Sequence, residues 1–335
     1  MLTPYTSAAI LGAGSLGTAL AKLLAPKLES IVLVSIETEC VEGINRDHRN
    51  PKYLSTVQLP PNISATTDHR AALDHPLVIF AVPSAAIRSV AVQLAALGLG
   101  PDTPLVSCAK GIERDTGERL SQILQDVFPA NPIGVLSGPN HAEEIALDMV
   151  TCAVIASADP DLAESLQELF TLPHFRTYTS DDVIGVEVGG AVKNVYALAA
   201  GMAHGLRVGD NAVAALVTRA LAEMTRLGVA MGGRPETFAG LSGVGDLIVT
   251  CFSEHSRNHR VGHAIGIGKT LEEAVAALGM VAEGVPNALS IHDVARKLGV
   301  RTPIIDGVHA ILYEGRSAAI AMREALDRDP RPEVS

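Results

Sequence analysis

The chain has 335 residues, of which 47% are hydrophobic and 19% charged, so it is long enough for two globular domains with buried cores. A net charge of −11 and a pI near 5.4 argue against nucleic acid as the main partner. Mean hydropathy is +0.27, but apolar stretches such as residues 195–203 are shorter than the roughly 18–20 residues that span a bilayer. We therefore expect no membrane insertion.

Four cysteines, Cys40, Cys108, Cys152 and Cys251, are scattered without a C-x-x-C pair. This usage is typical of reduced thiols, so we expect a cytoplasmic protein. The first apolar run has no basic region before it and leads directly into a glycine turn, so a signal peptide is not expected.

The first half of the chain alternates short apolar runs with amphipathic segments. Buried strands are predicted at residues 8–11, 31–34, 77–82, 105–107, 133–136 and 152–156. Helices are predicted at 15–24, 87–97 and 119–127. This alternation predicts an α/β fold, a Rossmann-type doubly wound parallel sheet with helices on both faces.

The pattern changes after the polar residues 179–182, which are typical of a turn and a helix start. Beyond them no strand is predicted, and helices are predicted at 183–202, 212–227, 271–277, 288–298 and 307–312. We therefore predict a nucleotide-binding sheet domain over residues 1–180 and an all-helical domain over 181–326. The charged residues 327–335 are predicted to form a mobile tail.

The segment Gly12-Ala13-Gly14-Ser15-Leu16-Gly17 matches G-x-G-x-x-G between a predicted strand and a predicted helix. In this motif Gly12 permits a tight turn, Gly14 lets the backbone approach a pyrophosphate, and Gly17 lets helix and strand pack closely. The helix N-terminus then presents free N–H groups to the phosphates. The motif in this context predicts a dinucleotide-binding site.

Glu37 follows the second predicted strand, about 20 residues after the glycine motif. An acidic side chain at this position accepts a hydrogen bond from the ribose 2′-hydroxyl of NAD. A solvated surface glutamate explains the position almost as well.

Two lysines are candidates for chemistry, because a nicotinamide domain followed by a helical domain suggests hydride transfer to a ketone, which needs an acid for the alkoxide. Lys110 follows a strand end, where open α/β sheets bind ligands. Lys193 lies in an apolar helix, where burial would lower its pKa towards a useful range. The alternatives are a surface turn lysine and a snorkelling lysine.

Seven blocks in chain order resemble the bacterial type of NAD(P)-dependent glycerol-3-phosphate dehydrogenase. They are GAGSLGTAL at 12–20, KGIE at 110–113, SGPNHAEE at 137–144, GGAVKN at 189–194, GVGDLIVTC at 243–251, SRN at 256–258 and AEG at 282–284. The resemblance implies interconversion of dihydroxyacetone phosphate and sn-glycerol 3-phosphate with NAD or NADP. It also implies that the glycerol 3-phosphate is supplied for phospholipid synthesis. It also implies a cytoplasmic homodimer, joined through the helical domain.

The resemblance implies that Lys193 is the general acid/base at the C2 oxygen, that Lys110 contacts cofactor and substrate, and that Asp246 holds the lysines. The predicted cofactor site comprises Gly12, Gly14, Ser15, Leu16, Gly17, Ile36, Glu37, Lys110, Ala142, Arg257, Val281 and Glu283. The predicted substrate site comprises Lys110, Gly138, Asn140, Lys193, Asn194, Asp246, Ser256, Arg257 and Asn258. Within it, Ser256 is a suitable N-cap for a following helix, and an Arg fork suits a phosphate.

The chain departs from the family pattern at four places. Asn140 stands where Ser or Thr is usual, His141 replaces Phe, and Ala282 replaces Val. Residues 34–36 lack the usual Trp followed by His or Arg, so the adenosine end loses its usual cationic group.

A like charge on Glu37 would repel the 2′-phosphate of NADP, so we expect a modest preference for NAD over NADP. Ser35, Arg46 or Arg49 would reverse that preference if one of them reached the phosphate.

His255, His259 and His263 are spaced i, i+4, i+8, which would place them on one helical face. Gly262 is expected to interrupt that helix, so solvated histidines beside an anion site are preferred to a metal site. Two other functions are alternatives. A related hydroxyacid dehydrogenase would turn over carboxylate substrates, and a non-catalytic nucleotide sensor would have no need for a buried acid/base lysine.

Overall fold

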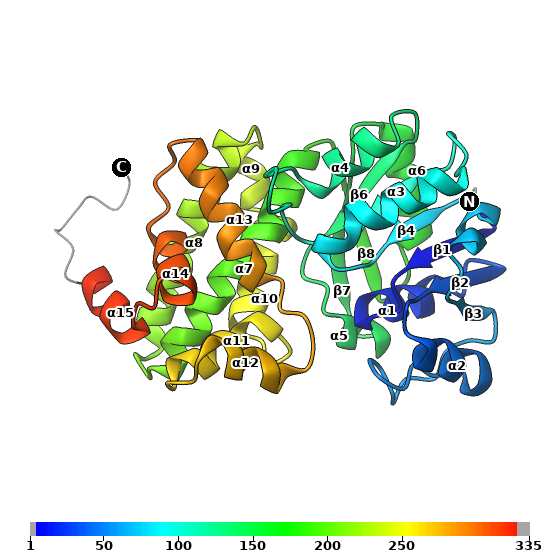
Figure 1. The fold of residues 1–335 in the computed structure, drawn as a ribbon. Coiled ribbons are helices and arrows are strands. Elements are labelled where there is room, and N and C mark those ends of the chain that lie inside the picture. Colours follow the sequence, from blue (N-terminus) through cyan, green and yellow to red (C-terminus); the bar gives the residue numbers. More distant parts are fainter. Residues whose placement is uncertain (1–4, 327–335) are drawn as a thin grey trace.

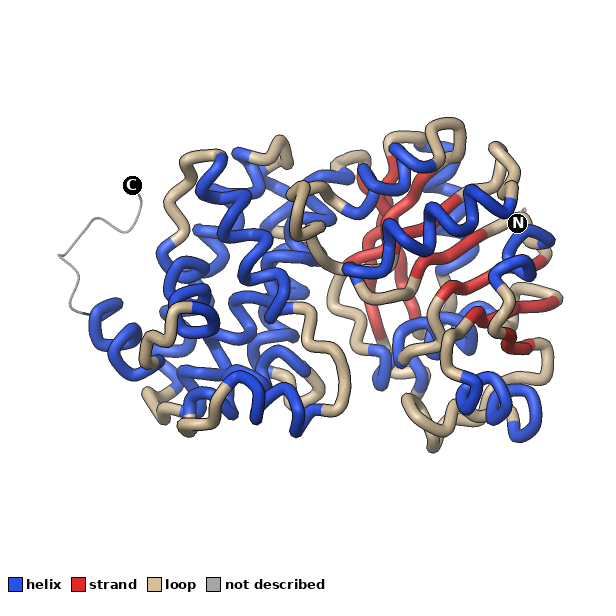
Figure 2. Tube along the Cα trace, in the orientation of Figure 1, coloured by secondary structure: helices blue, strands red, loops and turns tan. Residues whose placement is uncertain are grey.

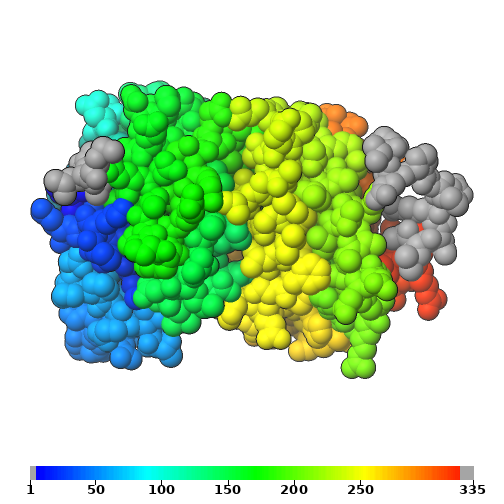
Figure 3. All heavy atoms as spheres, turned by 180° about the vertical axis from the view of Figure 1, so that it is seen from behind, coloured from blue at the N-terminus to red at the C-terminus, as the bar shows by residue number. Residues whose placement is uncertain are grey.

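The computed structural model describes residues 5–326, and the tail predicted at 327–335 lies outside the described residues. A sheet domain and a helical domain lie side by side (Figure 1). Seen from behind, the chain runs along the molecule from blue at one end to red at the other (Figure 3). The strands are β1 (Ser7–Leu11), β2 (Ser30–Val34), β3 (Ile63–Thr66), β4 (Val78–Phe80), β5 (Leu105–Ser107), β6 (Ile133–Ser137), β7 (Thr151–Ser157) and β8 (Phe175–Ser180).

These strands form one sheet in the order β3-β2-β1-β4-β5-β6-β7-β8. Neighbours from β3 to β6 are parallel, as predicted, but β7 pairs antiparallel with β6 and parallel with β8. The prediction of a wholly parallel sheet is therefore wrong for the last two strands. The physical reason is the connection after β6, which holds only the short helix α5 (Ala142–Ala146). Because α5 packs against α1 and does not cross a face of the sheet, the chain doubles back.

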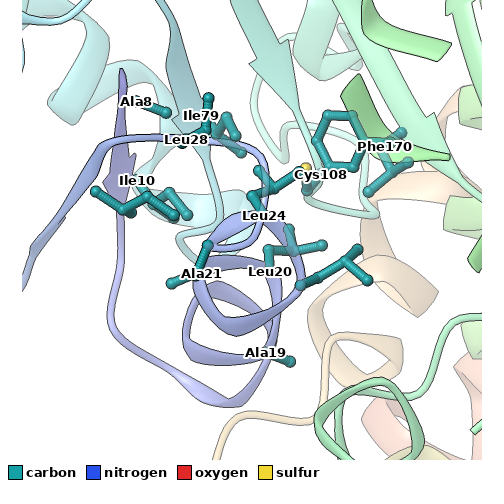
Figure 4. Packing of buried hydrophobic residues seen from close by; sticks show 14 of the residues in the cluster. Ala8, Ile10, Ala19, Leu20, Ala21, Leu24, Leu28, Ile79, Cys108 and Phe170 are labelled. Carbon is teal, nitrogen blue, oxygen red and sulfur yellow. The ribbon is translucent and has the colours of Figure 1, made fainter. Parts of the chain in front are cut away.

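Six helices and two 3₁₀ turns surround the sheet. They are α1 (Ser15–Leu24), α2 (Thr38–Asp47), η1 (His69–Asp74), η2 (Ser84–Ala86), α3 (Ile87–Leu97), α4 (Leu120–Val127), α5 and α6 (Pro160–Phe170). Along β1, Ile10 points into one hydrophobic cluster and Leu11 into another. The first cluster includes Leu20 and Leu24 of α1 and Phe170 of α6 (Figure 4). Alternate strand residues therefore fill a core on each face, which confirms the two-sided covering.

The second domain is helical throughout its described residues (Figure 2). Its helices are α7 (Val183–Gly205), α8 (Asp210–Ala230), α9 (Pro235–Phe238), α10 (Asp246–Phe252), α11 (Arg257–Gly266), α12 (Leu271–Leu278), α13 (Gly284–Lys297), α14 (Pro303–Tyr313) and α15 (Ala318–Leu326), with a π-helical turn η3 (Leu241–Gly245) before α10. By length and composition alone, the 23-residue α7 could span a membrane, but 83% of its most apolar window is buried inside the protein. Such burial is typical of a core helix.

Glycines bring α7 and α11 into backbone contact. A Cβ on Gly201 of α7 would lie 2.1 Å from the His259 carbonyl oxygen, and one on Gly262 of α11 would lie 2.1 Å from that of Leu198. The expectation that Gly262 interrupts the helix is therefore wrong, because α11 continues through it and packs directly on α7. The start of α11 is thereby held beside the middle of α7, where Lys193 lies.

Candidate active site

A cavity of about 930 Å³ lies between the carboxyl ends of the central strands and the helical domain. Most of the predicted site residues line it: Gly12, Gly14, Ser15, Leu16, Ile36, Glu37, Lys110, Asn140, Ala142, Lys193, Asn194, Asp246, Ser256, Arg257, Asn258, Val281 and Glu283. Gly17 and Gly138 are not among the lining residues. Gly17 lies under the glycine turn, and Gly138 contributes its carbonyl oxygen to Lys110.

The glycine turn has the close approaches that a dinucleotide site requires. Gly12 has φ +105°, and a Cβ there would lie 2.7 Å from the Ala81 carbonyl oxygen. A Cβ on Gly17 would lie 1.9 Å from the carbonyl oxygen of Gly12, so α1 begins directly on the turn. Gly14 faces open space, because a Cβ there would meet nothing within 4 Å. The open N-terminus of α1 therefore suits a pyrophosphate.

One carboxylate holds both lysines. Asp246 is 1% exposed; its Oδ1 accepts a hydrogen bond from Lys193 Nζ at 2.5 Å, and its Oδ2 accepts one from Lys110 Nζ at 2.7 Å. Lys193 Nζ also donates to Thr250 Oγ1 at 2.7 Å. Thr250 lies one helical turn after Asp246 on α10, and the sequence interpretation did not include it.

Lys110 is held from the sheet side as well. Its Nζ donates to the Gly138 carbonyl oxygen at 2.8 Å and to Asn140 Oδ1 at 2.7 Å. The amide of Asn140, where the family usually has a hydroxyl, thus orients the lysine. Its Nδ2 is buried without a partner among the described residues.

Burial and charge set the protonation of this cluster. Burial lowers the pKa of Lys193 to about 8, although Asp246 acts in the opposite direction. Burial alone would raise the pKa of Asp246, but Lys110 and Lys193 outweigh it and hold that pKa below its usual value. A charged lysine that releases its proton near neutral pH suits general acid/base catalysis.

The N-terminus of α11 forms another wall of the cavity. Ser256 caps the helix, its side chain accepting from the backbone N–H of His259. Asn258 Nδ2 donates to Asn194 Oδ1 at 2.8 Å, which joins α11 to α7 next to Lys193. Arg257 Nη1 donates to the Val281 carbonyl oxygen at 2.9 Å, and its side chain is exposed at the cavity. These groups form a cationic helix start that suits a phosphate.

Contacts across the cavity join the two domains. Glu283 accepts from the backbone N–H of Ser84 at 2.9 Å and from its Oγ at 2.5 Å. Asn287 Nδ2 donates to the Lys110 carbonyl oxygen at 3.2 Å. Sequence reasoning missed Ser84 and Asn287, because neither belongs to a block that the resemblance marks.

The adenosine end of the cavity differs from expectation. Glu37 forms an ion pair with Lys52, a residue that the sequence analysis did not select. Arg46 pairs with Asp47, and Arg49 Nε donates to Gln58, so neither arginine turns to the cavity.

Several histidines lie near the site. His141 lines the cavity, its Nε2 is buried without a partner among the described residues, and burial together with Lys193 lowers its pKa. The His141 and His255 rings lie 6.1 Å apart. His259 Nε2 lies 2.6 Å from His204 Nδ1, and burial lowers the pKa of His259 to about 4. Between residues 5 and 326 no group of three or more His, Cys, Asp or Glu side chains is arranged to hold a metal ion.

A fold that offers a dinucleotide turn at its sheet edge, with a buried lysine of lowered pKa in the same cavity, is typical of a nicotinamide-dependent dehydrogenase. The family models for the N-terminus and C-terminus of NAD-dependent glycerol-3-phosphate dehydrogenase match residues 7–163 and 182–323. The chain belongs to this family.

Individual relatives agree. A glycerol-3-phosphate dehydrogenase of the NAD(P)+ type from Exiguobacterium sp. is 47% identical over 330 residues, 97% of this chain and 96% of the relative. One from Azotobacter vinelandii is 48% identical over 327 residues, 97% and 96% of the two chains. The crystal structure of glycerol-3-phosphate dehydrogenase from Coxiella burnetii matches with a TM-score of 0.93 at 37% identity, covering 96% and 99%.

These matches confirm the predicted family, fold class and NAD(P)-dependent activity on glycerol 3-phosphate. They favour this activity over the alternatives of a hydroxyacid dehydrogenase and of a non-catalytic sensor.

Proposed function

We propose that Lys193 is the general acid that protonates the C2 oxygen of dihydroxyacetone phosphate, and the general base for sn-glycerol 3-phosphate in the reverse direction. The observation that carries this is the position of Lys193 Nζ, at the cavity and hydrogen-bonded to Asp246 and Thr250. Bound NADH or NADPH supplies the hydride that reduces the ketone carbon. Lys193 donates its proton to the oxygen as negative charge develops there.

Asp246 and Lys110 support this proton transfer. Asp246 favours the charged form of Lys193 through a buried hydrogen bond, so Lys193 is protonated near neutral pH. Lys110 places a second ammonium on the same carboxylate and adds positive charge where the alkoxide forms. The cluster carries two cations and one anion, and its excess charge suits an anionic substrate.

The substrate phosphate binds at the start of α11. Arg257 offers a planar fork, and Asn258 and Asn194 lie on the side towards Lys193. The free N–H groups and dipole of the helix add to this attraction. The phosphate site is thus a local cationic region in a chain with a net charge of −11.

Residues of the glycine turn would hold the dinucleotide. Gly12, Gly14, Ser15 and Leu16 would hold its pyrophosphate at the start of α1, and Glu37 would lie at the adenosine ribose. Ala142, Val281 and Glu283 line the cavity between this turn and the lysines.

We also infer the cellular setting. The enzyme supplies glycerol 3-phosphate for phospholipid synthesis as a cytoplasmic homodimer without membrane insertion, joined through residues 181–326. The four free cysteines support the cytoplasmic setting, and the burial of α7 supports the absence of membrane insertion. The dimer is inferred from the family resemblance.

The test is oxidation of NADH and NADPH by the purified full chain with dihydroxyacetone phosphate, beside unphosphorylated dihydroxyacetone and a panel of keto acids. We expect turnover to be fastest with the phosphorylated triose. Faster turnover of any keto acid would overturn the substrate assignment. Light scattering during size-exclusion chromatography should give twice the chain mass, and a monomer would remove the dimer from the proposal.

A further inference from the structure

The loop between α2 and β3 is fixed to the glycine turn. Asn50 in this loop is fully buried, and its Nδ2 donates to the Ala13 carbonyl oxygen at 2.7 Å and to Thr18 Oγ1 at 2.9 Å. Ala13 lies in the G-x-G-x-x-G motif, and Thr18 lies in α1. One buried amide therefore ties this loop to the element that holds the dinucleotide.

The same amide fixes the backbone of Lys52. Asn50 Oδ1 accepts from the backbone N–H of Lys52 at 3.2 Å and from that of Tyr53 at 3.3 Å. From the other side Pro51 packs on Gly43 of α2, where a Cβ would lie 2.6 Å from Pro51 Cδ. The Cα of Lys52 is thus held relative to the glycine turn, while its side chain remains 46% exposed.

The side chain of Lys52 lines the cavity together with Ser35, Ile36 and Glu37, at the end that the adenosine ribose would occupy. It forms an ion pair with Glu37, whose side chain is 29% exposed. Cys40 Sγ also donates to Glu37 at 3.5 Å. The Glu37 carboxylate therefore already has partners, and its negative charge is balanced by Lys52.

The other cations near this end are directed elsewhere. Arg46 pairs with Asp47, and Arg49 donates to Gln58. Among the lysines and arginines of residues 5–326 that line the cavity, the remaining three, Lys110, Lys193 and Arg257, belong to the catalytic and phosphate sites. Lys52 is thus the ammonium available to a group at the ribose 2′ position.

We propose that Lys52 determines whether NADP is accepted, by pairing with Glu37 beside a ribose 2′-hydroxyl and turning onto the 2′-phosphate when NADP binds. The inference rests on the dinucleotide site described under the proposed function and specifies its selectivity. Because the backbone of Lys52 is anchored, the change needs only rotation of its flexible four-carbon stem. Cofactor selectivity then depends on more than the charge of Glu37. It depends on how the Lys52 ammonium divides between the Glu37 carboxylate and the 2′-phosphate.

This balance changes the expected cofactor preference. An unpaired Glu37 would repel a 2′-phosphate, which was the basis for expecting a modest preference for NAD. With Lys52 shared between them, NADP and NAD are bound with similar affinity, within about fivefold of each other.

The test uses calorimetric binding to the full chain, so that no turnover is required. The two probes are adenosine 2′,5′-bisphosphate and adenosine 5′-phosphate, which differ only in the 2′-phosphate. Lys52→Gln should weaken binding of the bisphosphate about 5- to 20-fold and change that of the monophosphate less than twofold, because a partly exposed charged hydrogen bond is lost. Glu37→Gln should strengthen binding of the bisphosphate about two- to fivefold, since Lys52 is then free of its competitor.

Arg49→Gln is the matched control, a cation of the same loop whose loss should leave both affinities within twofold. The loss in Lys52→Gln should also shrink as salt is raised. The proposal is overturned if Lys52→Gln leaves bisphosphate binding unchanged, if it weakens both probes equally, or if Arg49→Gln has the same effect. Failure of the dehydrogenase reaction would leave these binding results as they are, so the two proposals fail separately.

Discussion

Replacing Asp246 by Asn removes the charge that both active-site lysines share. In the native site, Asp246 accepts from Lys193 at 2.5 Å and from Lys110 at 2.7 Å while being 1% exposed. Asn keeps the size of the side chain, but it loses the negative charge and offers one oxygen acceptor where the carboxylate offers two. The change therefore leaves Lys193 with burial and a like charge from Lys110, both of which lower its pKa.

The size of this effect follows from the contact that is lost. A hydrogen bond to a charged group contributes about 1.5–3 kcal/mol, which corresponds to about one to two pKa units. The pKa of Lys193, about 8 in the native chain, should thus fall to about 6–7. In the proposed mechanism reduction requires the protonated lysine, so the rate of reduction should fall as pH rises through this pKa, and the rate of the reverse oxidation should rise. At neutral pH the variant should reduce the ketone about 100-fold more slowly, because the acid is both less protonated and less well positioned.

The assay is kcat against pH in both directions at saturating substrates. Glu223→Gln is the control, because Glu223 is another buried carboxylate of the helical domain. It accepts from the backbone N–H of Ile304 and of Ile305 at 3.0 Å and from the Tyr196 hydroxyl, and among the described residues it makes no hydrogen bond to either lysine. The midpoint of the pH profile of kcat in Glu223→Gln should match that of the native chain. The reasoning would be refuted if Asp246→Asn kept the pH midpoint of the native chain, or if Glu223→Gln shifted that midpoint by the same amount.

Three further substitutions test separate parts of the site. Lys193→Ala should lower kcat by about 10²–10⁴ with little change in cofactor binding, and retention of more than about a tenth of native kcat would contradict its role as the acid. Arg257→Ala should raise KM for dihydroxyacetone phosphate about tenfold or more but leave that for dihydroxyacetone unchanged; equal losses would exclude it from the phosphate site. His141→Phe should raise the free energy of unfolding by about 1 kcal/mol in denaturant melts, because a buried nitrogen without a partner is removed, and a decrease would contradict this.

The sequence predicted the centre of the sheet better than its edges. Central strands such as β1 and β4 are buried on both faces and read as continuous apolar runs. The edge strands β3 and β8 have one exposed face. In β3 apolar residues alternate with polar ones, and in β8 Thr177 is buried while Tyr178 is exposed, so neither strand was predicted. The reversal at β7 depends on where a short helix packs, which no local pattern records.

The site shows the same division. The glycine motif and the segments around Lys110, Lys193 and Asp246 are local patterns, and they could be read from the sequence. Lys52 could not, because its position depends on the buried side chain of Asn50, which reaches back to a turn 37 residues earlier. A polar loop residue of this kind resembles any other until the fold brings its partners together.

The backbone contact between α7 and α11 fixes the distance between Lys193 and Arg257. Lys193 lies on one helix and Arg257 begins the other. No side chain separates the two helices where Gly201 lies against the backbone of His259 and Gly262 against that of Leu198. In the proposed roles of Lys193 and Arg257, the spacing from carbonyl oxygen to phosphate that a substrate must have is therefore set by main-chain packing outside the cavity. Redesign for a longer sugar phosphate would have to begin at these glycines. Enlarging residues on the cavity wall would alter the shape of the cavity but leave the separation of α7 and α11 unchanged.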